Sequence, residues 1–321
     1  MQQNIRQAGP SLQLSDLKSL RVFMTIADCG GLSAAQAKLG WSLSHISAIL
    51  SNFEQRFGVR LCERGRSGFS LTPEGQHIYE SSARLLQTLS VFESDLAAFR
   101  GILTGTLCIA GHGGDVTHER YVLPKVIRRF LSRDQNMANL RFETGSQDVI
   151  VNGVLNGTID VAIGYFPAAQ VGVAKYRLYA EKACLYCGRG HSLYDRADSV
   201  SPEEVATHDL VMRSETFPPF MPAVLRNAPV RAIAPTQEGR ALLVLSDKFL
   251  AFLPEHLAAP WVASGDMRRV GSNEFSYEIN VEMITRDAKR PSVLIASFLE
   301  DYTLVTLEEG FVAPRLWHHD H

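Results

Sequence analysis

Two loops carry the residues of this sequence that could bind or transform a small molecule. The first, Gly111-His112-Gly113-Gly114, has the pattern of the oxyanion loop of lipases and esterases, but the G-x-S-x-G turn of their serine nucleophile is missing. A dinucleotide fingerprint also fails, because Val116 stands at the third glycine position. The second loop, Thr144-Gly145-Ser146-Gln147, offers a serine hydroxyl. Free N–H groups at a helix start favour anions, so we predict a cradle for a carboxylate or phosphate and no catalytic residue.

Cys184-Leu185-Tyr186-Cys187, with His191 close behind, has a spacing found in metal and redox sites. A zinc site usually needs four ligands, and no second cysteine pair of this kind exists in the chain. Residues three apart on a strand point to opposite faces. We therefore predict two buried structural thiols, with a redox switch as the alternative. For Trp317-His318-His319-Asp320-His321 we favour an unstructured tail over weak metal binding. No metal site and no cofactor are expected.

The stretch from Ser33 to Gly58 predicts two helices joined by a tight turn at Gly40–Trp41, with Ser42 capping the second helix. In the first helix three alanines predict a small side that another helix can approach: Ala34, Ala35 and Ala37. In the second, four apolar residues predict one buried stripe: Ile46, Leu50, Phe53 and Phe57.

The opposite face of this second helix is polar and almost uncharged, which suits side chains that reach base edges in a major groove. It carries Ser44, His45, Ser47, Ser51, Asn52 and Gln55. The pattern predicts a helix-turn-helix with Ser44 to Phe57 as the recognition helix. An ordinary surface hairpin of helices is the alternative.

Elements on both sides of this pair are needed to position it. A helix opened by Ser15–Asp16 and closed by Gly30–Gly31 is predicted to pack behind the pair. After Gly58, VRLCERGRSGFSLT predicts two short strands around a turn, a wing that concentrates Arg60, Arg64 and Arg66. Wing arginines would contact phosphates and give affinity rather than sequence choice. A solvated basic hairpin is the alternative.

A long helix is predicted next, from Thr72-Pro73-Glu74 to about Arg100, because a capping hydroxyl, an early proline and a first-turn acid favour its start. Its apolar residues follow seven-, four- and three-residue steps, interrupted only by Ser82, and predict a seam for a partner helix. They are Ile78, Leu85, Leu89, Phe92, Leu96 and Phe99. The seam predicts a dimer and a two-fold DNA site; packing on its own chain is the alternative.

Beyond a break at Gly101–Thr106 the pattern alternates between β and α. TLCIAG, NLRFETGS and TIDVAIG are predicted strands, and helices are predicted from Leu123 to Leu131 and from Ser146 to Asn156–Gly157. Residues 181–285 repeat the style, with predicted strands KACLYCG, DLVMR, APVRAIAP, KFLAFLP and YEINVEMIT. The alternation predicts parallel strands with helices on both faces. Two such α/β lobes with a cleft between them suit a small ligand.

Composition bounds these interpretations. A chain of 321 residues with 45% hydrophobic content should hold two or three domains. The net charge of −2 excludes a generally basic coat for nucleic acid. The first residues, MQQNIRQAGP, lack the apolar run of a signal peptide, and no window is apolar enough to span a membrane. Five scattered cysteines fit free thiols in a reducing cytoplasm.

Together these motifs resemble the LysR-type transcriptional regulators over nearly the whole chain. The resemblance is strongest between Phe23 and Gly75, in Gly30-Gly31-Leu32-Ser33, Ile46-Ser47 and Leu71-Thr72-Pro73-Glu74-Gly75. It continues in Leu123-Pro124, Leu155-Asn156-Gly157, Ile159-Asp160-Val161-Ala162, His191-Ser192-Leu193 and Leu253-Pro254-Glu255. It implies an N-terminal all-α winged helix-turn-helix with a long linker helix, and a C-terminal α/β two-lobed effector domain similar to periplasmic binding proteins. It also implies homotetramers that control promoters.

The domain boundaries expected on this basis are a tail at 1–14, the DNA-binding domain at 15–75 and the linker helix at 76–100. Effector subdomain I is expected at 105–180 and 286–312, and subdomain II at 181–285.

The resemblance implies DNA contacts from Ser33 and Ser42 to phosphates, from Ser44, His45 and Ser47 near bases, and from Arg64 on the wing, with Ser51, Asn52 and Arg66 as further candidates. The effector candidates are His112, Gly113, Thr144, Ser146 and Gly164 in the first lobe, and Arg213 and Phe252 in the second. Where the family usually has Ser-Gln-Pro, this chain has Ser42-Leu43-Ser44, so the operator sequence is not implied. Gln36 and Cys62, which replace a usual alanine and a usual phenylalanine, are expected to be tolerated.

The sequence therefore predicts a cytoplasmic, sequence-specific transcriptional regulator and not an enzyme. Its expected partners are double-stranded promoter DNA, a small co-inducer with carboxylates as the candidate class, and further copies of itself as dimer or tetramer, with no membrane. RNA polymerase is a candidate partner. The alternative is a small-molecule receptor or enzyme with an appended dimerisation module; the missing signal peptide and the missing pair of nucleophile and base argue against it.

Overall fold

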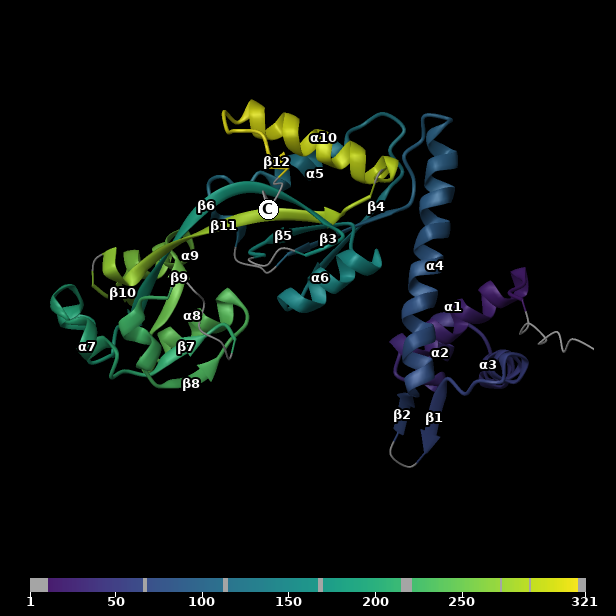
Figure 1. The fold of residues 1–321 in the computed structure, drawn as a ribbon, viewed down its shortest axis with the longest axis horizontal. Helices are drawn as coiled ribbons and strands as arrows, with labels where there is room; N and C mark the ends of the chain where they lie inside the picture. Colours follow the sequence, from purple (N-terminus) through teal and green to yellow (C-terminus); the bar gives the residue numbers. More distant parts are fainter. Residues whose placement is uncertain are drawn as a thin grey trace, which may run out of the picture. The chain divides into compact units, whose positions relative to one another are not determined.

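The computed structural model describes residues 11–65, 68–111, 115–166, 170–214, 221–271, 273–288 and 290–316. It consists of two compact units, Met1–Phe92 and Glu93–His321, which are described separately below (Figure 1). Within the described ranges, no helix is both long and apolar enough to cross a bilayer.

The first unit is a winged helix-turn-helix followed by a long helix. Its elements are α1 (Leu14–Asp28), α2 (Leu32–Leu39), α3 (Leu43–Phe57), β1 (Cys62–Gly65), β2 (Gly68–Leu71) and α4 (Pro73–Ala98). The wing strands β1 and β2 pair antiparallel. Helix α1 starts one residue earlier than predicted, because the Gln13 N–H donates to Asp16 Oδ2 at 2.6 Å and closes the first turn.

The turn between α2 and α3 is built as the sequence predicted. Gly40 ends α2 in the left-handed conformation, and Ser42 Oγ accepts the N–H of His45 at 3.3 Å. The predicted small side of α2 was wrong in part: Ala35 is fully buried, whereas Ala34 and Ala37 are exposed. Neighbouring helix positions are about 100° apart, so only Ala35 can face α1 and α3.

Two side chains fasten the wing to the helices. Glu54 Oε1, on α3, accepts the N–H of Leu61 at 2.7 Å. Thr72 Oγ1 donates to the carbonyl oxygen of Arg60 at 2.6 Å and accepts the N–H of Gly75 at 2.9 Å. A Cβ on Gly75 would lie 1.9 Å from the Leu61 carbonyl oxygen, so only glycine allows α4 to start this close to the wing.

The apolar seam of α4 divides into two parts. Ile78 and Leu85 are partly buried against the core of the winged helix-turn-helix. Phe92 and Leu96 keep 59% and 51% of their surface exposed, and Phe99, just past the helix end, keeps 88%. The chain therefore covers the first part of the seam itself, and only the second part is open to another molecule.

The second unit is built on an eight-stranded sheet with the order β10-β6-β11-β5-β3-β4, to which β9 and β12 add alongside β6. The strands are β3 (Thr106–Gly111), β4 (Asn139–Thr144), β5 (Val161–Gly164), β6 (Val173–Gly188), β9 (Ala251–Pro254), β10 (Met267–Arg269), β11 (Ser276–Arg286) and β12 (Arg315–Leu316). A separate parallel pair is formed by β7 (Leu210–Met212) and β8 (Val230–Ile233).

The prediction of parallel strands was right only in part for the second half of this unit, residues 181–285, where β7 and β8 pair parallel. Strands β3, β4 and β5 are parallel, but β6 pairs antiparallel with β9, β10 and β11. The chain leaves the first half along β6 and returns along β11, so these two long strands must run in opposite directions. The boundary expected at residue 180 falls inside β6, and β10 was not predicted.

Helices cover both faces of the sheet. In the first half, α5 (Leu123–Leu131) and α10 (Val293–Glu308) share a core with β3 and β5, and α6 (Gln147–Asn156) packs on the opposite face (Figure 1). The second half has two hydrophobic cores. Helices α8 (Gln237–Leu245) and α9 (Glu255–Ser264) contribute to one of them, and α7 (Pro202–Val205) contributes to the other. The two halves thus have separate cores, joined by β6 and β11.

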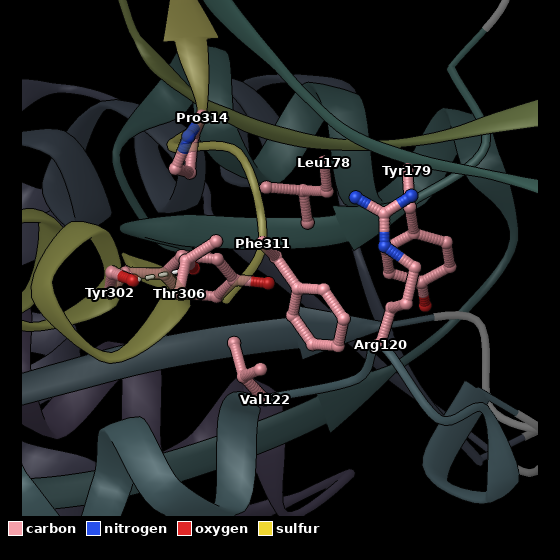
Figure 2. A pocket seen from close by; sticks show the side chains of 8 residues that line it. All are labelled: Arg120, Val122, Leu178, Tyr179, Tyr302, Thr306, Phe311 and Pro314. Atoms are coloured by element: carbon pink, nitrogen blue, oxygen red, sulfur yellow. Dashed lines mark hydrogen bonds between the residues drawn. The ribbon is translucent and has the colours of Figure 1, made fainter. Parts of the chain in front are cut away.

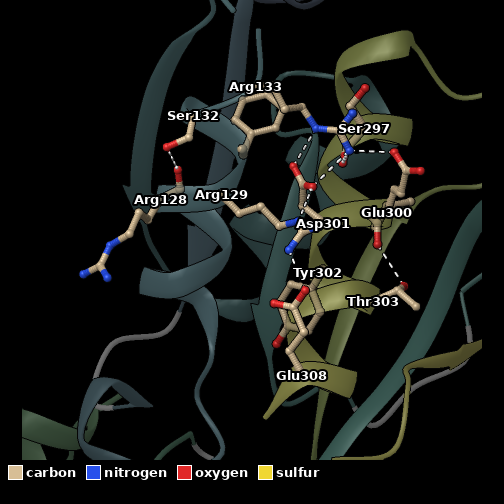
Figure 3. A network of polar contacts seen from close by, with 12 residues as sticks. Arg128, Arg129, Ser132, Arg133, Ser297, Glu300, Asp301, Tyr302, Thr303 and Glu308 are labelled. Carbon is tan, nitrogen blue, oxygen red and sulfur yellow. Dashed lines mark hydrogen bonds and ion pairs between the residues drawn. The ribbon is translucent and has the colours of Figure 1, made fainter.

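A cluster of ion pairs fastens α5 to α10 (Figure 3). Asp301 is 2% exposed and accepts hydrogen bonds from Arg133 Nε at 2.7 Å and Arg129 Nε at 3.2 Å. Arg133 also pairs with Glu300 at 2.6 Å, and Arg129 with Glu308 at 2.7 Å. One buried carboxylate therefore holds Arg129 of α5 and Arg133, two residues past the end of that helix, at once.

The stability of the second unit should decrease as the pH is lowered, because of His191. Burial and then the neighbouring ring of His208, 5.0 Å away between centroids, lower the pKa of His191. Its unfolded pKa is about 6.5, so below that value the unfolded chain takes up the proton more readily and stability is lost. Urea midpoints at pH 7.5 and 5.5 should show a smaller acid-induced loss for His191→Asn than for the parent chain.

The comparison with the variant is needed because Asp160 acts with the opposite sign. Burial raises the pKa of Asp160 to about 6, so its protonation favours the folded chain as the pH falls towards 4. The contribution of Asp160 is the same in the parent chain and in His191→Asn. It therefore cancels when the acid-induced losses of stability of the two proteins are subtracted. Identical pH dependence in both proteins would contradict the assignment to His191.

Candidate DNA-binding and effector-binding sites

The predicted DNA-reading face of α3 is available to a ligand. Ser42, Ser44, His45 and Ser51 are exposed, and Ser47 is half-buried. Ser33 is exposed at the start of α2. The face presents hydroxyl and imidazole groups, which can donate to and accept from base edges. The three buried residues of the stripe, Ile46, Leu50 and Phe53, hold the helix from the opposite side.

His45 is oriented by an aromatic contact that the sequence did not suggest. The ring of Trp41, in the turn before α3, meets the His45 ring edge to face, with centroids 5.2 Å apart and planes at 71°. Lys18 Nζ of α1 lies 4.8 Å from the centre of the Trp41 ring. Trp41 therefore restrains His45 and ties it to α1.

Replacing Trp41 by alanine should weaken base discrimination without unfolding the domain, because Trp41 is only half-buried. Because the His45 ring is no longer restrained, the variant should lose about tenfold in its preference for the selected base at one position of each half-site. Selection of binding sequences from a random duplex pool measures this, with Trp41→Phe as the control that keeps a ring. The same selected motif for the alanine variant and the parent chain would contradict a role in orienting His45.

The wing residues are only partly described. The backbone of Arg64 lies in β1, but its side chain, and the whole of Arg66, lie outside the described residues. Arg60 is exposed, and its Nε donates to the Cys62 carbonyl oxygen at 3.3 Å. Cys62 and Gln36, the two departures from the family pattern, are buried in the core and exposed on α2, respectively.

Arg56, on α3, was missed by the sequence analysis. Its Nη1 lies 2.7 Å from Asp16 Oδ1, and its Nη2 donates to the Ser11 carbonyl oxygen at 2.7 Å. Asp16 is 4% exposed. This pair fixes the recognition helix against the start of α1; a local reading could not find it, because its partners are 40 residues apart.

The described effector candidates of the first half, Thr144, Ser146 and Gly164, lie at one edge of the sheet. Gly111, at the end of β3, is aligned with Thr144 on β4 and with Ile163 on β5, so the three following loops begin side by side. Thr144 and Ser146 are exposed, and Ser146 is the N-terminal cap position of α6. Gly164 ends β5. His112 and Gly113 lie outside the described residues. The carboxyl edge of parallel strands is the usual ligand position in such sheets.

The two second-half candidates differ in their surroundings. Arg213 directly follows β7, and its guanidinium lies 5.6 Å from the centre of the Tyr165 ring, one residue after Gly164. It therefore touches the strand-end loop of the first half. Phe252, on β9, is 7% exposed and packs against the ring of Tyr277, with centroids 4.9 Å apart.

Arg240, on α8, is a further cation near these residues that the sequence analysis missed. Its guanidinium donates to the carbonyl oxygens of Phe252, Ala234 and Pro235 at 3.2–3.3 Å. Within the described residues it makes no ion pair. Burial lowers its pKa to about 10, and the charge of Arg213 contributes in the same direction. Arg213 and Arg240 thus raise the positive potential around Tyr277, whose hydroxyl both charges influence.

A small pocket lies elsewhere, between the start of α5 and the C-terminal segment that holds Phe311 and Pro314 (Figure 2). Arg120 stands at its side, with its guanidinium 5.1 Å from the ring centre of Phe311 and 5.9 Å from that of Tyr179. The rest of the lining is Val122, Leu178, Tyr302, Thr306 and Pro314. Of the predicted effector residues that the structure describes, none lines it.

The two cysteines of the C-x-x-C spacing do not face each other. Cys184 and Cys187 are fully buried and belong to different cores. Burial raises the pKa of each thiol to about 12, and Glu255, whose Oε1 accepts from Cys184 Sγ at 3.2 Å, raises that of Cys184 further. Buried, protonated thiols are poor nucleophiles, so this geometry does not suit a redox switch.

Comparison with known proteins matches both units to one family. Residues 17–76 match the family model "Bacterial regulatory helix-turn-helix protein, lysR family", and residues 103–303 match "LysR substrate binding domain". The HTH-type transcriptional activator BauR of Pseudomonas aeruginosa is 36% identical over 300 residues, covering 92% of this chain and 98% of that protein. The HTH-type transcriptional regulator ClcR of Pseudomonas putida is 29% identical, covering 80% and 89%.

Among solved structures, full-length CbnR in complex with its target DNA is similar with a TM-score of 0.63, at 21% identity, covering 90% of this chain and 99% of that one. At this identity the likeness concerns the fold. The relatives are named as transcriptional activators and regulators, not as enzymes. Matched along both of its units, the chain belongs to the LysR family of helix-turn-helix transcriptional regulators, proteins that bind DNA and respond to small-molecule effectors.

Proposed function

We propose that this regulator reads promoter DNA with α3 and the wing, through the residues predicted from the sequence. Ser44, His45 and Ser47 would meet base edges, Ser51 would lie at the border of the contact, and Ser33 and Ser42 would meet phosphates. Arg64 and Arg66 would follow the backbone. The exposed polar face of α3 opposite the buried Ile46, Leu50 and Phe53 is the observation that supports this proposal.

The DNA-binding proposal predicts two separable kinds of variant. Arg64→Ala should weaken binding to every duplex alike and reduce the slope of log K against log salt by about 1, because one phosphate contact is lost. His45→Ala should instead lower the preference for the selected operator over scrambled DNA. Fluorescence anisotropy titrations at several salt concentrations distinguish the two. An unchanged salt slope for Arg64→Ala would remove the wing from the proposal.

For the effector we propose a small anion, with carboxylates as the first class to test. Its binding residues would be His112, Gly113, Thr144, Ser146 and Gly164 from the first half, and Arg213 and Phe252 from the second. The contact between Arg213 and Tyr165 supports this, since it brings a cation of one half to the strand-end loop of the other. Arg240 would add positive potential.

A thermal-shift screen of the full chain against small organic acids, aromatic acids, amino acids and phosphates tests this proposal. A ligand at a hundred times its Kd should stabilise the second unit by about 2.7 kcal/mol. Arg213→Ala should abolish the response, whereas Arg231→Ala should keep it, because Arg231 pairs with Asp209 at the surface. Silence across every anionic class would exclude the anion proposal.

The remaining features belong to the same proposal. The exposed part of the α4 seam supports self-association as a dimer, and the family supports a tetramer and RNA polymerase as further partners. We propose that the protein acts in the cytoplasm and that the domain boundaries are those expected from the sequence.

A further inference from the structure

Three side chains form a hydrogen-bonded relay across the two halves of the second unit. Thr117, in the 3-10 turn Asp115–Thr117 that follows the Gly111–Gly114 loop, has its Oγ1 2.8 Å from His256 Nδ1. His256 Nε2, at the start of α9, lies 3.1 Å from Glu181 Oε2 on β6. Glu181 is 4% exposed. The relay therefore runs from a loop of the first half, through a helix of the second, to one of the strands that join them.

The chemistry of the three groups requires a hydrogen-bonding side chain at each position of the relay. A carboxylate only accepts, so His256 donates from Nε2 to Glu181. The Thr117 hydroxyl can donate to the Nδ1 lone pair of a neutral imidazole or accept from the Nδ1–H of an imidazolium, so it serves either form of the ring. A hydroxyl is required at residue 117, and a methyl group of the same size would leave Nδ1 without a hydrogen-bond partner from the first half.

A second histidine reinforces the contact. The ring of His118 stacks on Tyr179, with centroids 4.3 Å apart, and meets His256 edge to face at 4.8 Å. The Arg120 N–H donates to His118 Nδ1 at 3.1 Å. Burial and the nearby His256 lower the pKa of His118, against an opposing effect of Glu181 and Glu119. The ring of His118 therefore packs between Tyr179 and His256 at the junction of the two halves.

We infer that the Thr117–His256–Glu181 relay is a clasp that holds the two halves in the arrangement described here. His256 is its positioning residue, acting through Thr117 on the segment next to the Gly111–Gly114 loop. Because Thr117 follows this loop by three residues in the sequence, the clasp would shift the population of the binding-competent arrangement, and the apparent affinity of a ligand scales with that population. This effect on a ligand rests on the proposed effector site, whereas the clasp itself does not.

The distance between the halves tests the clasp without any ligand. Spin labels at Asp134→Cys, after α5, and Glu203→Cys, on α7, are both at exposed positions. A Cys29→Ser background removes the one native cysteine that is not buried. Labelled full-length protein diluted tenfold with unlabelled protein keeps distances between subunits out of the measurement. The comparison is between the parent chain, Thr117→Val, Thr117→Ser and His256→Leu.

A net hydrogen bond contributes a factor of roughly three to ten to an equilibrium. Thr117→Val and His256→Leu should therefore raise the population of longer distances by roughly that factor. Thr117→Ser, which restores the hydroxyl, should give the parent distribution. A parent-like distribution for Thr117→Val would overturn the clasp, as would a Thr117→Ser distribution that matches Thr117→Val. Failure of the anion screen would leave these distances unchanged, so the two failures can be told apart.

If the anion screen yields a ligand, the same variants give a second readout. Thr117→Val should bind it roughly three- to tenfold more weakly, and Thr117→Ser should bind it as the parent does. Equal affinity of Thr117→Val and the parent chain would contradict the coupling between clasp and ligand.

Discussion

Asp301→Ala is expected to lower the free energy of unfolding of the second unit by about 3 kcal/mol. The carboxylate is 2% exposed and accepts hydrogen bonds from both Arg129 and Arg133. Its removal therefore leaves two cations next to α10 without their buried anionic partner. The expected loss lies at the lower end for a broken buried pair, because both arginines keep a second acidic partner and reach solvent. Urea unfolding followed by far-UV circular dichroism measures the effect.

Glu308→Ala is the matched control. Its carboxylate pairs with the same Arg129 at 2.7 Å, but its side chain is 59% exposed, and exposed pairs contribute about 0–1 kcal/mol. If both substitutions cost the same, burial of Asp301 would not be the reason for its effect. Asp301→Asn should fall between them, since an amide keeps one acceptor oxygen but loses the charge.

The elements that could be predicted from the sequence are those with local signals. Ser42 and Gly40 mark the two ends of the helix-turn-helix turn, and Gly157 ends α6, because capping depends on residues within one turn. The stripe of α3 could be read for the same reason, since its spacing is set by the helix itself.

Pairing between distant strands leaves no such local signal. Strand β6 runs unbroken from Val173 to Gly188, but only its second part was predicted as a strand. Its antiparallel partners β9, β10 and β11 come from 65 residues (Ala251 opposite Tyr186) to 113 residues (Arg286 opposite Val173) further along the chain. Three residues, Met267–Arg269, are too few to show an alternating pattern.

The candidate sites show the same division. The loops after β3 and β4 could be predicted as ligand positions, because each follows its own strand. The contact of Arg213 with Tyr165, the carbonyl partners of Arg240 and the relay through His256 could not, because each joins residues far apart in the chain. Trp41 was read only as a turn residue, and its contact with His45 depends on the angle between α2 and α3.

Leu50→Ala should have the largest effect on DNA binding, although Leu50 touches no DNA. The side chain is 0% exposed, in the middle of α3, and packs in the core shared by α1, α2 and the wing. Truncating a buried leucine costs about 2–5 kcal/mol, a large part of the stability of a domain this small. Operator binding should therefore be lost together with the first unfolding transition of the full chain, which is that of the N-terminal unit. Calorimetry of the full chain measures this transition.

Leu43→Ala separates this effect from a change in the DNA contact. Leu43 begins the same helix and is 43% exposed, so the same substitution should cost less than about 0.5 kcal/mol and leave the first transition in place. The unfolding transition of the second unit should be unchanged in both variants, because the two units have separate cores. A Leu50→Ala protein that keeps both its first transition and its operator affinity would show that α3 does not depend on its buried stripe. A loss of affinity with the transition intact would instead place Leu50 in the DNA contact itself, which its complete burial argues against.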